Sequence, residues 1–173
     1  MDKTDSMPSL VICDAGPLIH LDELGCLDLL GDFDRIIVPD TVCSEVDRHR
    51  PSVFSHPDVE LQRMTAAKPV PAVLSSIARI FTLHAGEWEA LRIALEFPSG
   101  IFLTDDTAAR LAAGNLGIKV HGTIGILIRS IRRKQRTSEA ILETLRKIPE
   151  VSTLHLKSSL LDAIILQVEA TKS

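Results

Sequence analysis

Short apolar runs alternate with helix-like segments along this chain. Four runs, LVIC, RIIV, IFLT and IKVH, occupy residues 10–13, 35–38, 101–104 and 118–121. They have the length of strands and are apolar enough to be buried on both faces of a sheet. A fifth stretch, VELQRM (59–64), alternates in polarity and predicts an edge strand. Strands that recur between helices indicate βαβ units, so the pattern predicts a parallel sheet.

Helix-like patterns fill most of the chain between and after these runs. They occupy residues 18–24, 26–31, 40–48, 71–80, 86–97, 106–115, 123–134, 138–147 and 157–170. Residues 49–57 contain two prolines and predict a loop. Helices that pack on both faces of the strands give an α/β fold with three layers, αβα, around a central, mostly parallel sheet. The last two helical patterns follow the final strand as extra C-terminal helices.

Composition favours one globular domain without a membrane span. The chain has 173 residues, of which 45% are hydrophobic, and contains no apolar run of 18 residues. Its start lacks the basic and long apolar segments of a secretory signal. Three cysteines, Cys13, Cys26 and Cys43, show no C-x-x-C spacing and predict buried free thiols. We therefore expect a cytoplasmic protein.

Charge is distributed unevenly along the chain. Residues 14–47 carry nine acids and one base, whereas residues 119–136 carry six bases and no acid. Four of those bases, which we interpret as RNA-binding residues, are Arg129, Arg132, Arg133 and Lys134. A basic run of this kind is typical of a surface that binds a polyanion. A solvated helix face accounts for the bases equally well.

Acidic residues follow two of the predicted strands directly. Asp14 comes after LVIC, and Asp105 and Asp106 come after IFLT and Thr104. The carboxyl ends of parallel strands meet at one edge of a sheet, where ligands usually bind. Each aspartate could also serve as a helix cap. Their clustering at one edge favours a chemical role.

The helix around GEWEALRIALEF gives two neighbouring glutamates different environments. At about 100° per residue, Glu87 shares a face with the apolar residues Ala90 and Leu91. Glu89 falls on the opposite side with Arg92, so we interpret it as surface charge. An inward carboxylate needs a partner, because an unpaired buried charge is costly. The alternative for Glu87 is a cap that accepts N–H groups at its own helix start.

Carboxylates that share one edge repel each other, and a hard divalent cation relieves that repulsion. Mg²⁺ and Mn²⁺ prefer oxygen ligands. The six histidines are scattered and show no zinc-site spacing with cysteine. A cation held by carboxylates can activate water and neutralise the charge that develops on a phosphodiester.

Six segments, in this order and spacing, resemble PIN-domain proteins. They are D-A-G-P-L-I (14–19), the short LDLL (27–30), I-I-V-P-D-x-V-x-x-E (36–45), G-E-W-E-A-L (86–91), L-T-D-D-x-x-A-R (103–110) and H-G-T-I-G-I-L (121–127). The nearest likeness is to the branch that opens with D-x-x-P-L-I, which is described as nucleic-acid-binding and is similar to VapC-type toxins. The resemblance spans about residues 9–135 and implies a PIN-like nuclease domain there, with a C-terminal helical extension over 136–173 packed on it.

The resemblance implies a metal-dependent ribonuclease with four acids around Mg²⁺ or Mn²⁺. The matching positions are Asp14, Glu45, Glu87 and Asp106. Asp105 is an alternate metal ligand, because the family's T-x-D pattern fits Thr104-Asp105-Asp106, and Thr104 would be a supporting hydroxyl. The chain departs from VapC-type toxins at Ala15-Gly16, where hydroxyl or amide residues are frequent.

Three functions fit these features. The first is a ribonuclease that cleaves single-stranded RNA, as the toxin of a pair with a small antitoxin protein. The second is a PIN-like module that binds RNA or protein without efficient cleavage. The third, a phosphotransfer domain with Asp14 as nucleophile, lacks the D-x-D spacing. The resemblance also implies a homodimer, and the apolar pattern of residues 154–165 fits either a dimer contact or core.

Overall fold

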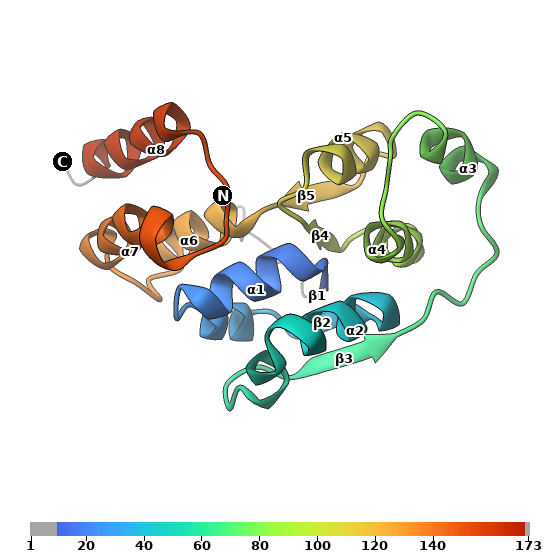
Figure 1. Cartoon of the computed structure of the whole chain (residues 1–173), viewed down its shortest axis with the longest axis horizontal. Coiled ribbons are helices and arrows are strands. Elements are labelled where there is room, and N and C mark those ends of the chain that lie inside the picture. Colours follow the sequence, from blue (N-terminus) through green and yellow to red (C-terminus); the bar gives the residue numbers. More distant parts are fainter. Residues whose placement is uncertain (1–9, 172–173) are drawn as a thin grey trace, which may run out of the picture.

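The computed structural model describes residues 10–171 and has a five-stranded parallel sheet at its centre (Figure 1). The strand order is β3-β2-β1-β4-β5, and every neighbouring pair is parallel. The strands are β1 (Leu10–Cys13), β2 (Arg35–Pro39), β3 (Leu61–Met64), β4 (Ile101–Leu103) and β5 (Lys119–His121). The predicted edge strand is therefore β3, at one end of the sheet.

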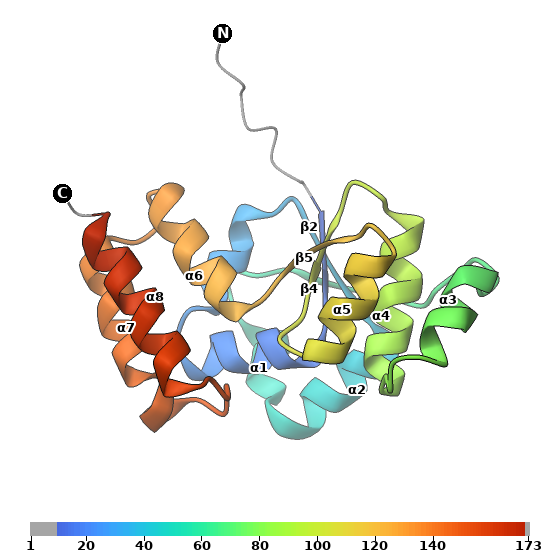
Figure 2. The same ribbon diagram turned by 90° about the horizontal axis from the view of Figure 1, so that it is seen from above.

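Helices cover both faces of this sheet. One side carries α1 (Ala15–Glu23), α6 (Thr123–Arg132), α7 (Ser138–Val151) and α8 (Ser158–Ala170), and the other carries α3 (Ala72–Ala78), α4 (Ala85–Glu96) and α5 (Thr107–Asn115) (Figures 1 and 2). Helix α2 (Asp40–His49) contacts both α1 and α4. Two 3₁₀ helices, η1 (Leu27–Asp32) and η2 (Pro51–Ser55), complete the elements. The three-layer α/β prediction is confirmed.

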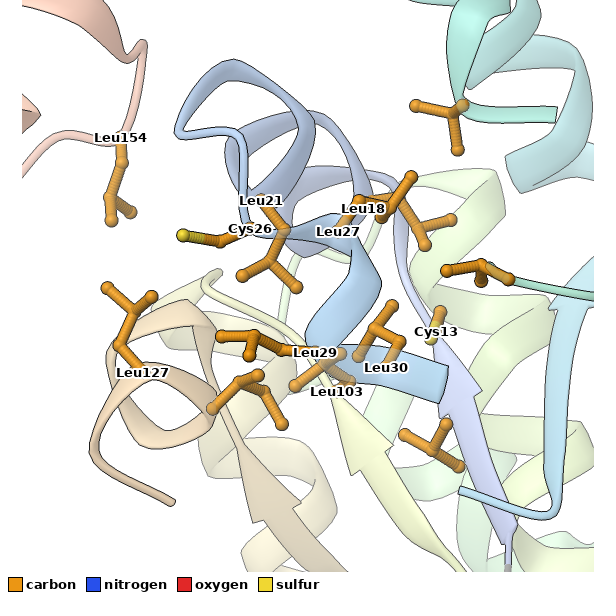
Figure 3. Packing of buried hydrophobic residues seen from close by; sticks show 14 of the residues in the cluster. Cys13, Leu18, Leu21, Cys26, Leu27, Leu29, Leu30, Leu103, Leu127 and Leu154 are labelled. Carbon is orange, nitrogen blue, oxygen red and sulfur yellow. The ribbon is translucent and has the colours of Figure 1, made fainter. Parts of the chain in front are cut away.

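Two apolar cores lie on opposite faces of the sheet, because successive strand side chains point to opposite sides. Val11 and Cys13 face the core beneath α1 and α6, while Ile12 faces the core beneath α4 and α5. Figure 3 shows the first core, in which Leu18 and Leu21 of α1, Leu29 and Leu30 of η1 and Leu103 of β4 belong to one buried cluster. These two cores hold the sheet rigid beneath its carboxyl edge.

The helix boundaries differ most from the predicted ones at three places, and the predicted loop at 49–57 contains the 3₁₀ helix η2. Helix α1 begins at residue 15 rather than 18, because the Asp14 side chain accepts the Ala15 N–H and caps the helix. The segment predicted as a helix at 26–31 is the 3₁₀ helix η1. Helix α7 continues through Pro149 to Val151, since Leu145 and Ile148 keep its later turns on the core.

The C-terminal helices share the core of the strands. Leu145 of α7 and Leu161 of α8 belong to the same buried cluster as Val11. The predicted division into 9–135 and 136–173 stays a prediction, and its residues 9, 172 and 173 lie outside the described range. None of the helices within residues 10–171 combines the length and apolar character needed to cross a bilayer. The three cysteines are buried and free, as predicted.

Candidate active site at the carboxyl edge of the sheet

A cavity of about 470 Å³ opens at the carboxyl edge of the sheet, and we call it the acid cavity. The ends of β1 and β4 adjoin here, because the Asp14 N–H donates to the Leu103 carbonyl at 2.9 Å. Ten of the lining residues are Asp14, Ala15, Gly16, His20, Glu45, His84, Glu87, Asp105, Asp106 and His155. Five separate carboxylates thus reach one space from β1, α2, α4 and the β4–α5 turn.

Asp14 is, with Glu87, one of the two buried acids of this cavity. Its side chain is buried and accepts two hydrogen bonds at 2.8 Å, from the Ala15 N–H and the Thr104 hydroxyl. Burial raises the pKa of the Asp14 carboxyl to about 6, and the charges of Glu87 and Glu45 add to the rise. The two hydrogen bonds act in the opposite direction. Asp14 therefore lies in a field of like charge that a cation would relieve.

Thr104 connects the acids at the ends of the two central strands. Its fully buried hydroxyl donates to Asp14 and accepts the Asp106 N–H at 3.2 Å. Asp106 caps α5 by accepting the Ala109 N–H through Oδ1 at 2.8 Å. Thr104 thus lies between two of the predicted acids, and its role as a supporting hydroxyl at a metal stays a prediction.

Asp105 uses both carboxylate oxygens within the protein. Oδ1 accepts the Thr123 N–H at 2.7 Å, and Oδ2 accepts the Thr123 hydroxyl at 2.6 Å. His20 Nδ1 lies 2.8 Å from the same Oδ2 and donates to it when protonated on that nitrogen. A side chain at Gly122 would place its Cβ only 2.6 Å from Asp105 Oδ1. Asp105 therefore fixes the start of α6 and the ring of His20, which leaves Asp106 with more free ligand capacity.

Helices α2 and α4 bring the two glutamates to the cavity. A Cβ placed on Gly86 would lie 3.7 Å from Glu45 Oε2 and 3.8 Å from Asp14 Oδ1. Gly86 therefore leaves the space between those two carboxylates open. Glu87 is buried beside it, on the face that helical geometry predicted.

Glu87 also holds the first turn of its own helix. Its Oε2 accepts the His84 N–H at 2.8 Å, and its Oε1 lies 3.3 Å from His84 Nδ1. The hydrogen bond between the His84 and Glu87 side chains raises the pKa of the exposed His84 imidazole, and the Glu87 charge raises it further. The capping and cavity-lining interpretations of Glu87 therefore both hold.

Glu89 is not surface charge, and that prediction is wrong. Its carboxylate is buried and accepts both the N–H and the hydroxyl of Thr41, at 3.0 and 2.6 Å. Helix α2 has no side-chain cap of its own, so Glu89 supplies one from the neighbouring helix. Helical phase alone missed this role, because the polar face of α4 packs against the start of α2.

The predicted RNA-binding residues do not line the acid cavity. Arg129 is buried, pairs with Asp32 at 2.7 Å and lies over the Phe33 ring at 4.4 Å from its centroid. Its predicted exposure to RNA is therefore wrong, because the acidic early segment neutralises it within the fold. Arg133 also pairs with Asp32, at 3.1 Å. The exposed residues Arg132 and Lys134 stand at the far end of α6, a helix about 15 Å long.

The sequence analysis missed the histidines around the cavity. His20, His84 and His155 come from α1, the start of α4 and the α7–α8 segment. Only His84 had a local signal, its position three residues before Glu87 as in a capping box. His155 depends on the path of residues 152–157, which Glu23 fixes by accepting the Thr153 N–H at 2.7 Å and the Ser152 hydroxyl at 2.8 Å.

Comparison with known proteins identifies one family. The model of the DUF3368 family, described as a PIN domain, matches residues 10–170. A search of curated proteins found no match. PIN domains bind nucleic acid, are often nucleases and typically use divalent metal ions. The match spans all five strands and both C-terminal helices. The chain therefore belongs to the DUF3368 family of PIN domains.

Proposed function

We propose that the protein is a metal-dependent ribonuclease that cleaves single-stranded RNA at the acid cavity. The observation that carries this proposal is the gathering of five carboxylates on one cavity. Among residues 10–171, no lysine or arginine lines that cavity to balance them. A divalent cation held by these carboxylates would balance their charge and oppose the charge that develops on a phosphodiester during hydrolysis.

The residues of the cavity fit Mg²⁺ or Mn²⁺. Their donors are mainly carboxylate oxygens, and the pKa of Asp14 is raised to about 6 by burial and by neighbouring acids. Within the described residues, no three acidic, histidine or cysteine side chains form a ready-made metal group. Mg²⁺ is usually held by one or two carboxylates together with water and substrate phosphate, so the arrangement suits it. We assign Asp14, Glu87 and Asp106 as the ligands, with Asp105 behind them.

When bound, the cation would lower the pKa of water and neutralise charge on the phosphate. The chain's own residues do the positioning. The Thr104 hydroxyl fixes the positions of the Asp14 side chain and the Asp106 backbone by hydrogen bonds. Asp105 stabilises the adjacent turn by accepting the Thr123 N–H. Glu45 is exposed at the cavity, where its carboxylate can accept a proton from an attacking water.

RNA with unpaired, flexible segments suits this site better than a stacked duplex. The chain has few aromatic residues, 3% of the total, so base stacking is not its main source of affinity. The resemblance to VapC-type toxins supports a role as the toxin of a pair with a small antitoxin protein. A homodimer is part of the same proposal.

A binding module without efficient cleavage is the second candidate. Ala15 and Gly16 stand after Asp14 and offer no side-chain hydroxyl or amide to a ligand. This observation favours an altered site in which the acids hold a cation and RNA without rapid turnover.

Cleavage of a mixed RNA pool in Mn²⁺ separates the two candidates. We expect the wild type to cleave and Asp14→Asn to lose activity by orders of magnitude. Asp34→Asn is the matched control, because Asp34 is exposed and precedes β2 at the opposite edge of the sheet. RNA binding without cleavage by the wild type would establish the binding module. Equal cleavage by Asp14→Asn would exclude the acid cavity as the active site.

A further inference from the structure

A second cavity of about 700 Å³ lies beside the acid cavity. The two share three lining residues, Asp105, Leu154 and His155, so they form one continuous depression. The second cavity lies between the start of α5, the β5–α6 turn, residues 154–157 and the first turns of α8. Its size is within the range of small-ligand sites, about 300–1,000 Å³.

The walls of the second cavity differ in chemistry from those of the acid cavity. Arg110 and Lys157 are exposed cations on opposite walls, one on α5 and one just before α8. Burial lowers the pKa of His121, and the charge of Arg110 lowers it further, so this ring is a neutral hydrogen-bonding group. The apolar part of the lining comprises Ile124, Leu154, Leu156, Leu160 and Ile164.

Arg110 ties this cavity to the acid cavity. Its guanidinium donates to the Thr104 carbonyl at 3.1 Å, and the Thr104 hydroxyl binds Asp14. A positive charge that lines the second cavity is therefore connected to Asp14 through Thr104. A polyanion with one phosphate at the acids would place a neighbouring phosphate near this guanidinium.

We propose that the second cavity is a subsite for the nucleotide next to the scissile phosphate. This inference rests on the proposed function. Arg110 and Lys157 bind the phosphate of that nucleotide, and its unpaired base packs against Leu156, Leu160 and Ile164. A paired base remains stacked in its duplex and does not enter, so the subsite selects single-stranded RNA. Among the described residues no Phe, Tyr or Trp ring lines the cavity, so the base is held mainly by aliphatic contact, with little preference for its identity.

The test measures binding of a short single-stranded RNA in chelator, where cleavage does not interfere. Lys157→Gln removes a positive charge from the second cavity, and Leu160→Asn makes part of its apolar lining polar. Their matched controls are Lys147→Gln, an exposed lysine on α7, and Leu166→Asn, which lies on α8 outside the cavity and is 65% exposed. We expect Lys157→Gln to weaken binding several-fold and to reduce the slope of log affinity against log salt by about 0.7.

Leu160→Asn should weaken binding at all salt concentrations without changing that slope. An RNA with one abasic position should reproduce the loss in the wild type and show no further loss in Leu160→Asn. Far-ultraviolet circular dichroism and melting temperature check that each variant folds. Arg110→Lys, which keeps the charge, should bind better than Arg110→Gln.

Each outcome separates the subsite from the proposed function. Wild-type affinity in both Lys157→Gln and Leu160→Asn, with cleavage intact, overturns the subsite and leaves the ribonuclease in place. If both variants bind RNA more weakly and the wild type does not cleave RNA, the subsite is supported and the ribonuclease proposal is overturned. A wild type that neither binds nor cleaves RNA overturns both.

Discussion

At the scale of single residues, Glu87 and Glu89 show how two buried carboxylates on one helix differ in role. Glu87 lines the acid cavity, whereas Glu89 binds Thr41 of α2. Glu87→Gln retains an oxygen that can cap the helix but removes the charge, so activity should fall by orders of magnitude with little change in stability. Glu89→Ala removes the carboxylate that caps α2 through the Thr41 N–H and hydroxyl, and should cost about 1 kcal/mol of unfolding free energy.

Cleavage rates and denaturant midpoints check this pair. The site assignment is contradicted if Glu87→Gln retains wild-type cleavage. The assignment of Glu89 as a cap in trans is contradicted if Glu89→Ala unfolds at the wild-type midpoint.

Asp14 gives a pH dependence with a definite sign. Its pKa is about 6 in the folded, metal-free protein, above the usual value for an aspartate. Between about pH 4 and pH 6 the folded state holds a proton that the unfolded state has released, so the contribution of Asp14 to stability falls as pH rises. The unfolding free energy of Asp14→Asn relative to the wild type should therefore increase by about 2 kcal/mol from pH 4 to pH 7 in chelator. If the difference in unfolding free energy between Asp14→Asn and the wild type stays constant with pH, the raised pKa of Asp14 is contradicted.

At the scale of elements, the β4–α5 turn and the start of α6 meet at Gly122. A Cβ at this position would lie 2.6 Å from Asp105 Oδ1 and 3.3 Å from the Thr104 carbonyl. Gly122→Ala should displace Asp105, loosen the start of α6 and lower both the melting temperature and the cleavage rate. Gly114→Ala is the control, because a Cβ there meets no atom within 4 Å on α5. The control should melt at an equal or higher temperature, since alanine favours a helix by about 1 kcal/mol over glycine. Equal behaviour of the two variants would show that the contact at Gly122 is not tight.

The sequence predicted the strands and most helices because each carries its own periodicity. LVIC and the first three residues of IFLT are apolar, and both form buried strands of the sheet centre. The cavity acids after those strands could be located for the same reason, since parallel strands end at one edge. Helix α1 was placed three residues late because its start depends on the Asp14 side chain, a contact that periodicity does not register.

The remainder of the site depends on contacts between distant segments. Glu89 binds Thr41, 48 residues away, and His20 binds Asp105, 85 residues away. Residues 153–155 reach the acid cavity because Glu23 anchors them across 130 positions. No local pattern encodes these pairings, so the histidines and the second cavity could not be found from sequence.

At the scale of the whole molecule, the acidic early segment and the basic late segment partly neutralise each other within the fold. Arg129 and Arg133 pair with Asp32, and Arg136 pairs with Asp28 at 2.6 Å. Arg129→Gln removes a buried ion pair and a cation–π contact, so it should destabilise the protein by about 2 kcal/mol. The exposed neighbour Arg132→Gln should stay within about 0.5 kcal/mol of the wild type. Chemical denaturation measures the unfolding free energy of both variants. Equal stability of the two would contradict the structural role of Arg129.

Metal binding at Asp14 is the central claim, and calorimetric titration of Mn²⁺ tests it most directly. The account predicts that the wild type and Asp34→Asn bind Mn²⁺ with equal affinity, and that Asp14→Asn loses most of that affinity while remaining folded. Mg²⁺ should compete for the same site. Wild-type Mn²⁺ affinity in Asp14→Asn would contradict the account, because the ion would then bind away from the cavity where the five carboxylates gather.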